Sequence, residues 1–202
     1  MAAALGYRFL DEDGNQLPQG GGGLSGLASI DASTADPRIK DTIFRVACDV
    51  TNPLTGKRGA SAVYGPQKGA SPADVELLDK GLSRLADLVE REIGIQAREK
   101  PGAGAAGGLG YGLTVFCGAS LETGIDIVLD AVNFEERIED VDLVITGEGK
   151  IDGQTAYGKV PIGVARRAKK YGVPVLVIAG DIGDGIEEIY DAGIDAVMST
   201  VN

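Results

Sequence analysis

The stretch 142–159, DLVITGEGKIDGQTAYGK, places four charged side chains among four glycines in its part from 147 to 159. Carboxylate oxygens are the ligands that Mg²⁺ takes from proteins, whereas a lysine meets a phosphate as a point charge. Glycines let the backbone approach a ligand closely and adopt conformations that side chains disfavour. The segment therefore carries the groups that a site for a metal ion and a phosphorylated molecule needs. The charged residues are Glu148, Lys150, Asp152 and Lys159, and the glycines are Gly147, Gly149, Gly153 and Gly158.

The elements around this segment are typical of an anion site. The apolar run 143–145 predicts a buried strand, the following polar residues a loop, and Pro161 the first turn of a helix. Such a helix presents unpaired N–H groups and the positive end of its dipole to the loop. Gly153 to Lys159 matches the pattern G-x-x-x-x-G-K, but Val160 replaces its Ser or Thr, and the strand lies too far upstream. We therefore expect an anion site that is not a Walker A loop. The alternative is a βα turn with solvated charges.

A second set of polar side chains follows a predicted strand at residues 43–50. Asp49 and Asn52 stand at its C-terminal end, which is where open α/β sheets bind ligands. The next stretch, 50–73, contains no acid and the three basic residues Lys57, Arg58 and Lys68. A lysine held in a Gly/Pro-rich loop, as Lys68 is, can meet an anion. The alternatives are an Asx or proline turn and solvated loop charges.

A glycine-rich run at residues 101–112, PGAGAAGGLGYG, contains the pattern G-x-G-x-x-G at Gly102, Gly104 and Gly107. A dinucleotide site needs a strand directly before this pattern, but the preceding residues QAREK are polar and Pro101 follows them. A nicotinamide-dependent oxidoreductase is therefore not supported. Two interpretations stay open: the run offers N–H groups to an anion, or it lets two backbones pack closely.

Composition excludes several functions. The net charge of −11 argues against binding nucleic acid or an anionic membrane surface. The absence of histidine removes Ser-His-Asp and Cys-His catalysis. No apolar run approaches the roughly 20 residues that span a bilayer, and the N-terminus does not read as a signal peptide. Cys48 and Cys117 are expected to be buried free thiols in a reducing cytosol, so we expect a cytoplasmic protein.

Periodicity predicts an α/β protein with two α/β domains, residues 1–122 and 123–202. In the first, Ser71 and Asp74 form a capping box before a long amphipathic helix, and residues 109–117 form another helix. In the second, Thr123 caps a helix, and strands at 143–145, 174–179 and 195–200 alternate with helices at 162–171 and 186–192. This βαβαβ order predicts a parallel sheet with right-handed crossovers. The second domain is thus expected to be a three-layer, Rossmann-like half-domain that is incomplete.

The chain resembles the type I glycerate kinases. The resemblance rests on CDVTNPLTGKRGASAVYGPQKGA, PGAGAAGGLGYGL and LVITGEGKIDGQTAYGK, three long segments at 48–70, 101–113 and 143–159. It implies transfer of a phosphoryl group from ATP to D-glycerate with Mg²⁺, in a two-domain enzyme whose site lies between the domains. It carries over to the residues Asp49, Asn52, Lys68, the glycines from 102 to 108 (Gly102, Gly104, Gly107 and Gly108 among them), Glu148, Asp152, Gln154 and Lys159.

Chemistry assigns roles to these residues. Asp49 would orient or deprotonate the glycerate hydroxyl, Lys68 and Lys159 would neutralise phosphate, and Glu148 or Asp152 would hold Mg²⁺. Further contacts to substrate or phosphate are expected from Arg58, Gly147 and Gly149.

The chain departs from the family pattern at its ends. An Asp-Ser-Phe-Lys segment, a Gly-Gly-Ser-x-Thr-Asn-Asp-Gly-Gly loop and a C-terminal helical tail that family members carry do not occur here. We therefore expect a fragment. The alternative function is a catalytically inactive remnant that binds anions weakly and forms a homodimer through exposed sheet edges.

Overall fold

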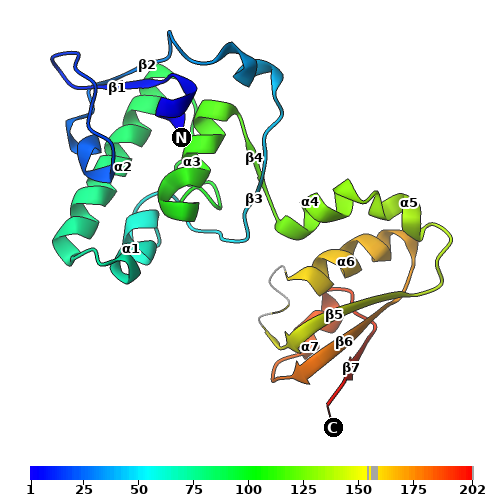
Figure 1. Ribbon diagram of the computed structural model, residues 1–202. Helices are drawn as coiled ribbons and strands as arrows, with labels where there is room; N and C mark the ends of the chain where they lie inside the picture. The colour runs from blue at the N-terminus through cyan, green and yellow to red at the C-terminus, as the bar shows by residue number, and fades with distance from the viewer. Residues whose placement is uncertain (154, 156–158, 202) are drawn as a thin grey trace. The chain divides into compact units, whose positions relative to one another are not determined.

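The computed structural model describes residues 1–153, 155 and 159–201, and the chain divides into two compact units, Met1–Glu122 and Thr123–Asn202 (Figure 1). Each unit has its own hydrophobic core. None of the helices in the described residues is long and apolar enough to cross a membrane. The α/β class with parallel strands, predicted from the sequence, is confirmed.

The first unit combines helices with two small two-stranded sheets. Strands β1 and β2 pair antiparallel, and β3 and β4 pair in parallel. Its strands are β1 (Arg8–Leu10), β2 (Ser29–Asp31), β3 (Arg45–Ala47) and β4 (Ser120–Glu122). Its α-helices are α1 (Ala60–Tyr64), α2 (Pro72–Glu92) and α3 (Ala105–Cys117), and its 3₁₀ turns are η1 (Ala2–Leu5), η2 (Gly21–Gly26), η3 (Pro37–Asp41) and η4 (Pro66–Lys68).

Helix α2 forms where the sequence predicts it. The Ser71 hydroxyl accepts the Asp74 N–H, and the Asp74 carboxylate accepts the Ser71 N–H, so the predicted capping box is present. The apolar face of α2 then buries Leu85, Leu88 and Val89 in the core. Local signals suffice here because the cap and the apolar stripe belong to the same helix.

Helix α3 has an irregular start. Ala106, Gly107 and Gly108 have φ values of 50°, 75° and 97°, so its regular part begins at Leu109, as the sequence predicts. The buried ring of Tyr111 anchors this helix in the core. Within the described residues the Tyr111 hydroxyl has no hydrogen-bond partner.

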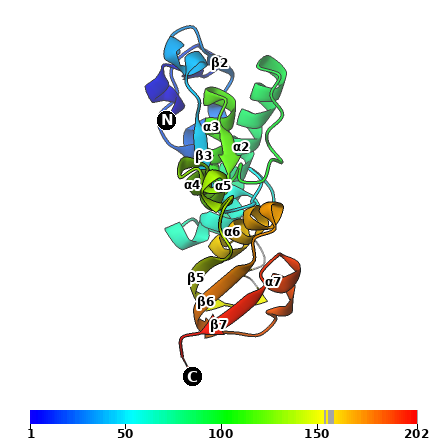
Figure 2. The ribbon, with the colours of Figure 1, turned by 90° about the vertical axis from the view of Figure 1, so that its right-hand side faces the viewer.

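The second unit contains the parallel sheet, with strand order β5-β6-β7. Figure 2 shows α6 and α7 beside this sheet. Their buried residues Ala165 and Ile189 share a core with Val175 and Val177 of β6. On the opposite face of the strands Ile145, Ile178 and Met198 are exposed. The elements are α4 (Gly124–Ala131), α5 (Phe134–Ile138), β5 (Val144–Ile151), α6 (Val160–Ala168), η6 (Lys169–Tyr171), β6 (Val175–Ile182), α7 (Glu187–Asp191) and β7 (Ala196–Ser199).

Strand β5 corrects one prediction from the sequence. The predicted strand ended at Ile145 and a polar loop followed, but β5 runs on to Ile151. Its polar half pairs in register with β6, for example Glu148 with Ala179 and Lys150 with Asp181. Pairing with β6 satisfies the backbone of this polar stretch, so poor intrinsic β-propensity does not end the strand. The loop therefore begins only at Asp152.

A charged network joins α4, α5 and α6. The Arg167 side chain is 11% exposed and donates to the carboxylates of Asp126 (3.0 Å), Asp130 (2.5 Å) and Glu135 (2.8 Å). Although burial lowers the pKa of Arg167, these hydrogen bonds raise it above its usual range. Arg166, which is 56% exposed, also donates to Asp126. Thr123 caps α4, as predicted, and its hydroxyl donates to the same carboxylate at 2.6 Å.

Candidate functional sites in the two units

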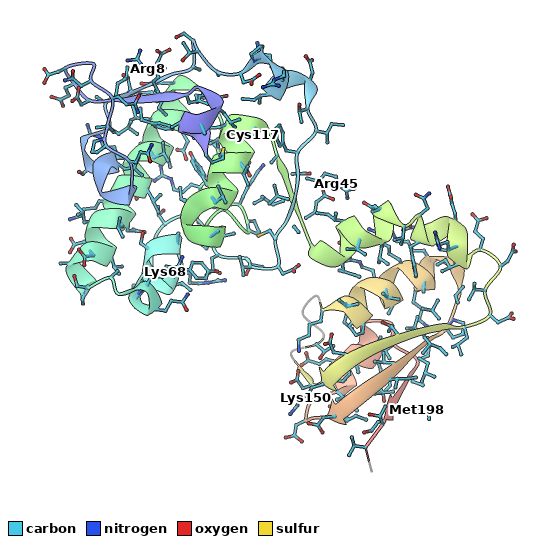
Figure 3. All side chains as sticks on the ribbon, viewed as in Figure 1. Arg8, Arg45, Lys68, Cys117, Lys150 and Met198 are labelled. Carbon is cyan, nitrogen blue, oxygen red and sulfur yellow. The ribbon has the colours of Figure 1, made fainter. Side chains whose placement is uncertain are left out.

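A polar cavity of about 470 Å³ lies at the carboxyl ends of β5 and β6 in the second unit. This edge of a parallel sheet is where open α/β folds bind ligands. Lys150, labelled in Figure 3, lines it beside Asp152. Its lining residues are Lys150, Asp152, Gly153, Gly183, Asp184, Gly185 and Glu188. Acidic side chains therefore outnumber basic ones around this cavity.

Asp152 and Lys159, both predicted as catalytic, lie together at this edge. The Lys159 ammonium is 3.8 Å from the Asp152 carboxylate, and Lys159 is the N-cap residue of α6. Thr155, which is fully buried, accepts the Asp152 N–H at 3.1 Å, and the Thr155 N–H donates to the Asp152 carbonyl at 2.9 Å. These bonds hold the turn after β5 and fix the backbone that carries the carboxylate. Sequence analysis did not identify Thr155.

The remaining predicted residues of this segment lie in different places. Gly147, Glu148 and Gly149 belong to strand β5, and Glu148 accepts the N–H of Gly149 at 3.3 Å. Gln154 lies outside the described residues. Asp184 follows the polar end of β6 and lines the cavity together with Glu188. Sequence analysis missed Glu188, because nothing local to its short helix distinguishes it from a solvated acid.

The described residues do not bring three or more acids, cysteines or histidines together as a ready-made metal cage. Mg²⁺ is usually held by one or two carboxylates, with waters and substrate phosphates completing its shell. Asp152, on the cavity wall, fits this mode of binding. Glu148 does not line the cavity.

A second cavity, of about 500 Å³, lies within the first unit between α1, α2, η2 and η4. Figure 3 labels Lys68 between α1 and α2, and this lysine lines the cavity together with Gly107. Two residues predicted from separate motifs are thus brought to one cavity. The wall is completed by Gly21, Gly22, Ala60, Ser61, Tyr64, Gly65, Gly69, Ala70, Asp74, Leu77, Leu78 and Leu82.

The side chain and the backbone of Asn52 are hydrogen-bonded to other segments of the first unit. Its amide oxygen accepts the Tyr64 hydroxyl at 2.8 Å, and its amide nitrogen donates to the Arg58 carbonyl at 2.8 Å. Its own carbonyl accepts the Gly104 N–H at 2.9 Å. Asn52 therefore holds the start of the basic segment, the end of α1 and the glycine run together. The side chains of Asp49 and Arg58 are exposed nearby in sequence.

The glycine run allows close backbone packing at some positions and lines a cavity at another. A Cβ on Gly104 would lie 2.3 Å from the Pro53 carbonyl oxygen, and one on Gly102 would lie 2.7 Å from the Cys48 sulfur. These two glycines allow close packing. At Gly107 a Cβ would meet nothing within 4 Å, although φ is 75°, and this residue faces the cavity. Gly108, whose φ is 97°, packs towards Leu54 and Leu82.

Comparison with known proteins agrees with the resemblance seen in the sequence. The profile of the glycerate kinase family matches residues 1–202. Proteins named glycerate kinase from Halalkalibacterium halodurans and Bacillus subtilis are each 54% identical over 201 residues, and a glycerate 2-kinase from Escherichia coli is 52% identical. Each match covers 100% of this chain and 53% of the relative.

A solved structure shows the same fold. The crystal structure of a "putative glycerate kinase 2" from Salmonella typhimurium LT2 superimposes with a TM-score of 0.84 and 54% sequence identity. The match covers 98% of this chain and 51% of that chain. The chain thus spans about half the length of the relatives that it matches.

Proposed function

Because the chain belongs to the glycerate kinase family, we propose that it takes part in ATP-dependent phosphorylation of D-glycerate to phosphoglycerate. The observation that carries the proposal is the 54% identity, over the whole of this chain, to relatives named glycerate kinase. The geometry supports it, because phosphoryl transfer depends mostly on positioning and charge neutralisation, and the described sites offer charged groups on fixed turns.

In the second unit we assign the phosphates and the metal ion to Asp152 and Lys159. Lys159 occupies the N-cap position of α6, so its ammonium and the helix N-terminus would both meet a phosphate. The cavity wall carries Asp152, Asp184 and Glu188 against Lys150, which disfavours a bare phosphate. A phosphate that arrives with Mg²⁺ suits this charge balance. Asp152 would hold the ion, which neutralises charge on the transferred group.

In the first unit we assign the acceptor and further phosphate contacts. Asp49 would orient or deprotonate the glycerate hydroxyl, while Lys68 and Arg58 would meet anionic groups. Asn52 acts through the residues that it holds in place, Tyr64 and the Arg58 carbonyl. ATP, Mg²⁺ and D-glycerate are thus the proposed ligands.

The free thiols of Cys48 and Cys117 support a reducing, cytoplasmic setting. Self-association as a homodimer remains a prediction.

The test is turnover of D-glycerate with Mg·ATP, followed by ³¹P NMR to distinguish 2- from 3-phosphoglycerate. We expect Asp152→Asn and Lys159→Met to lower kcat/KM by roughly a hundredfold or more, the range found for removing a group that stabilises transition-state charge. Matched controls are Asp140→Asn and Lys170→Met, two exposed charges outside both cavities.

Both control variants should keep wild-type kinetics, and circular dichroism should show the same fold in all four proteins. Unchanged rates in Asp152→Asn and Lys159→Met would remove their proposed roles. A wild-type chain that neither turns over D-glycerate nor binds ATP would refute the proposed function for this chain and favour the inactive remnant.

A further inference from the structure

The cavity in the first unit is apolar on one side and charged at its rim. Leu77, Leu78 and Leu82 of α2 form the apolar side, and Lys68 stands in the segment before that helix. Leu77 is 47% exposed, so it is not committed to the core of the unit. Within the described residues Lys68 has no ion-pair partner. Such a cavity suits a ligand with an apolar body and an anionic end.

Tyr64 gives this cavity a fixed aromatic surface. Its ring lines the cavity, and its hydroxyl is tied to the Asn52 amide oxygen at 2.8 Å. Aromatic side chains held in this way stack on nucleobases, since every base offers a flat π-face. One oxygen of Asp74, Oδ2, is used by Ser71, whereas Oδ1 has no hydrogen bond within the described residues. That oxygen could accept a hydrogen bond from a sugar hydroxyl.

The two substrates of the proposed function differ in what they could place here. D-glycerate has three carbons, each bearing oxygen, so it has no surface to bury against three leucines and a tyrosine. The nucleotide carries a flat, weakly polar base at one end and phosphates at the other. A cavity of about 500 Å³ lies within the range of small-molecule sites.

We propose that this cavity binds the nucleoside moiety of the phosphoryl donor, with the base between Tyr64 and the leucines of α2 and the phosphates leading past Lys68. The inference rests on the proposed function, because that function supplies the nucleotide. This placement would explain the glycine at position 107. Its backbone is left-handed, and the lack of a side chain keeps the rim of the cavity open.

Calorimetric titration of the 202-residue chain with three probes tests this placement: adenosine, ATP and inorganic tripolyphosphate. Leu77→Ala should weaken binding of adenosine and ATP about fivefold, since it removes part of the apolar wall. Tyr64→Ala should weaken it about tenfold, within the range for losing one stacked base, whereas Tyr64→Phe should keep it. Affinity for tripolyphosphate should stay unchanged in all three variants. The matched control is Leu143→Ala, a leucine that is 44% exposed in the second unit.

The outcomes separate this inference from the proposed function. If Leu77→Ala and Tyr64→Ala bind adenosine and ATP as tightly as wild type, the base binds elsewhere and the inference is wrong, whatever the rate of glycerate phosphorylation. The same holds if wild type binds tripolyphosphate but not adenosine. If both variants lose adenosine while no protein phosphorylates D-glycerate, the nucleoside site stands and the proposed function fails. Because Leu77 is largely exposed, Leu77→Ala remains informative even if Tyr64→Ala does not fold.

Discussion

Replacing Arg167 with methionine should destabilise the second unit far more than the same change at Arg166. Arg167 is 11% exposed and is shared by the carboxylates of Asp126, Asp130 and Glu135. Methionine keeps much of the apolar stem but removes the cation that Asp126, Asp130 and Glu135 share. Arg166 is 56% exposed and serves Asp126 alone among the described acids.

The magnitude follows from exposure. Breaking a buried ion pair costs about 3–5 kcal/mol when the remaining charge is fully desolvated. Here the carboxylates of Asp126, Asp130 and Glu135 are 24%, 38% and 33% exposed, so water relieves part of their repulsion. We therefore expect a loss of about 2–3 kcal/mol for Arg167→Met. For Arg166→Met we expect less than about 1 kcal/mol, as for an exposed pair.

The assay must report on the second unit, because two compact units can unfold separately. Amide hydrogen exchange of peptides from α4 and α6, followed by mass spectrometry, meets this need. The expected loss corresponds to exchange that is roughly 30- to 150-fold faster in Arg167→Met, since each 1.4 kcal/mol is a factor of ten. Peptides from α2 in the first unit serve as the internal control. If the two arginine variants exchange at the same rate in α6, the shared cation does not hold these helices together.

Three further changes test the energetics. Hydrogen bonds from Thr123, above all, and from Arg166 and Arg167 lower the pKa of Asp126 from 3.8 to about 2. The stability that the ionised Asp126 contributes should therefore be complete above about pH 4 and lost as pH falls towards 2. In urea unfolding, the free energy of unfolding should change less between pH 5 and pH 2 for Asp126→Asn than for wild type, and an equal change would contradict this. Tyr111→Phe should raise the free energy of unfolding by about 1 kcal/mol in urea titrations, because it removes a buried hydroxyl that has no partner in the described residues. A destabilised variant would point to a partner such as bound water. Ala106→Gly should stabilise the first unit by about 0.5–1 kcal/mol, because Ala106 has φ 50°, a left-handed conformation that glycine adopts more easily than alanine. A fall in the urea midpoint would show that this backbone is not strained.

Sequence predicted the elements whose signals are local. The capping box before α2 and the Thr123 cap of α4 both lie within a few residues of the helices that they begin. The parallel sheet followed from the βαβαβ order, because handedness leaves few ways to connect such strands. In the first unit, by contrast, β4 was not predicted. It is three residues long and exists through pairing with β3, from which it is separated by more than seventy residues.

The positions of the site residues depended on contacts that no short window contains. Asn52 is hydrogen-bonded to Tyr64, Arg58 and Gly104. Sequence analysis had named Asn52, Arg58 and Gly104 as candidates, each for a different local reason. Sequence analysis did not predict Tyr64 as a site residue, because a tyrosine near the end of a short helix is an ordinary amphipathic residue. Only the fold shows that Tyr64 lines a cavity while its hydroxyl donates to the Asn52 amide oxygen.

The longer β5 changes how the glycines of the second unit are interpreted. With the strand ending at Ile151, Asp152 becomes the first residue of the loop, and the path from strand to helix spans only the residues between Asp152 and Lys159. Gly147 and Gly149 then lie in the ladder itself, where Gly149 approaches β6 so closely that a Cβ on Gly180 would be 2.6 Å from its carbonyl oxygen. Backbone packing thus accounts for Gly180, whereas it does not account for the Asp152–Lys159 pair at the carboxyl end of β5. A charged pair kept 3.8 Å apart beside a helix N-terminus gains little stability at such exposure, which favours a role in binding over one in folding.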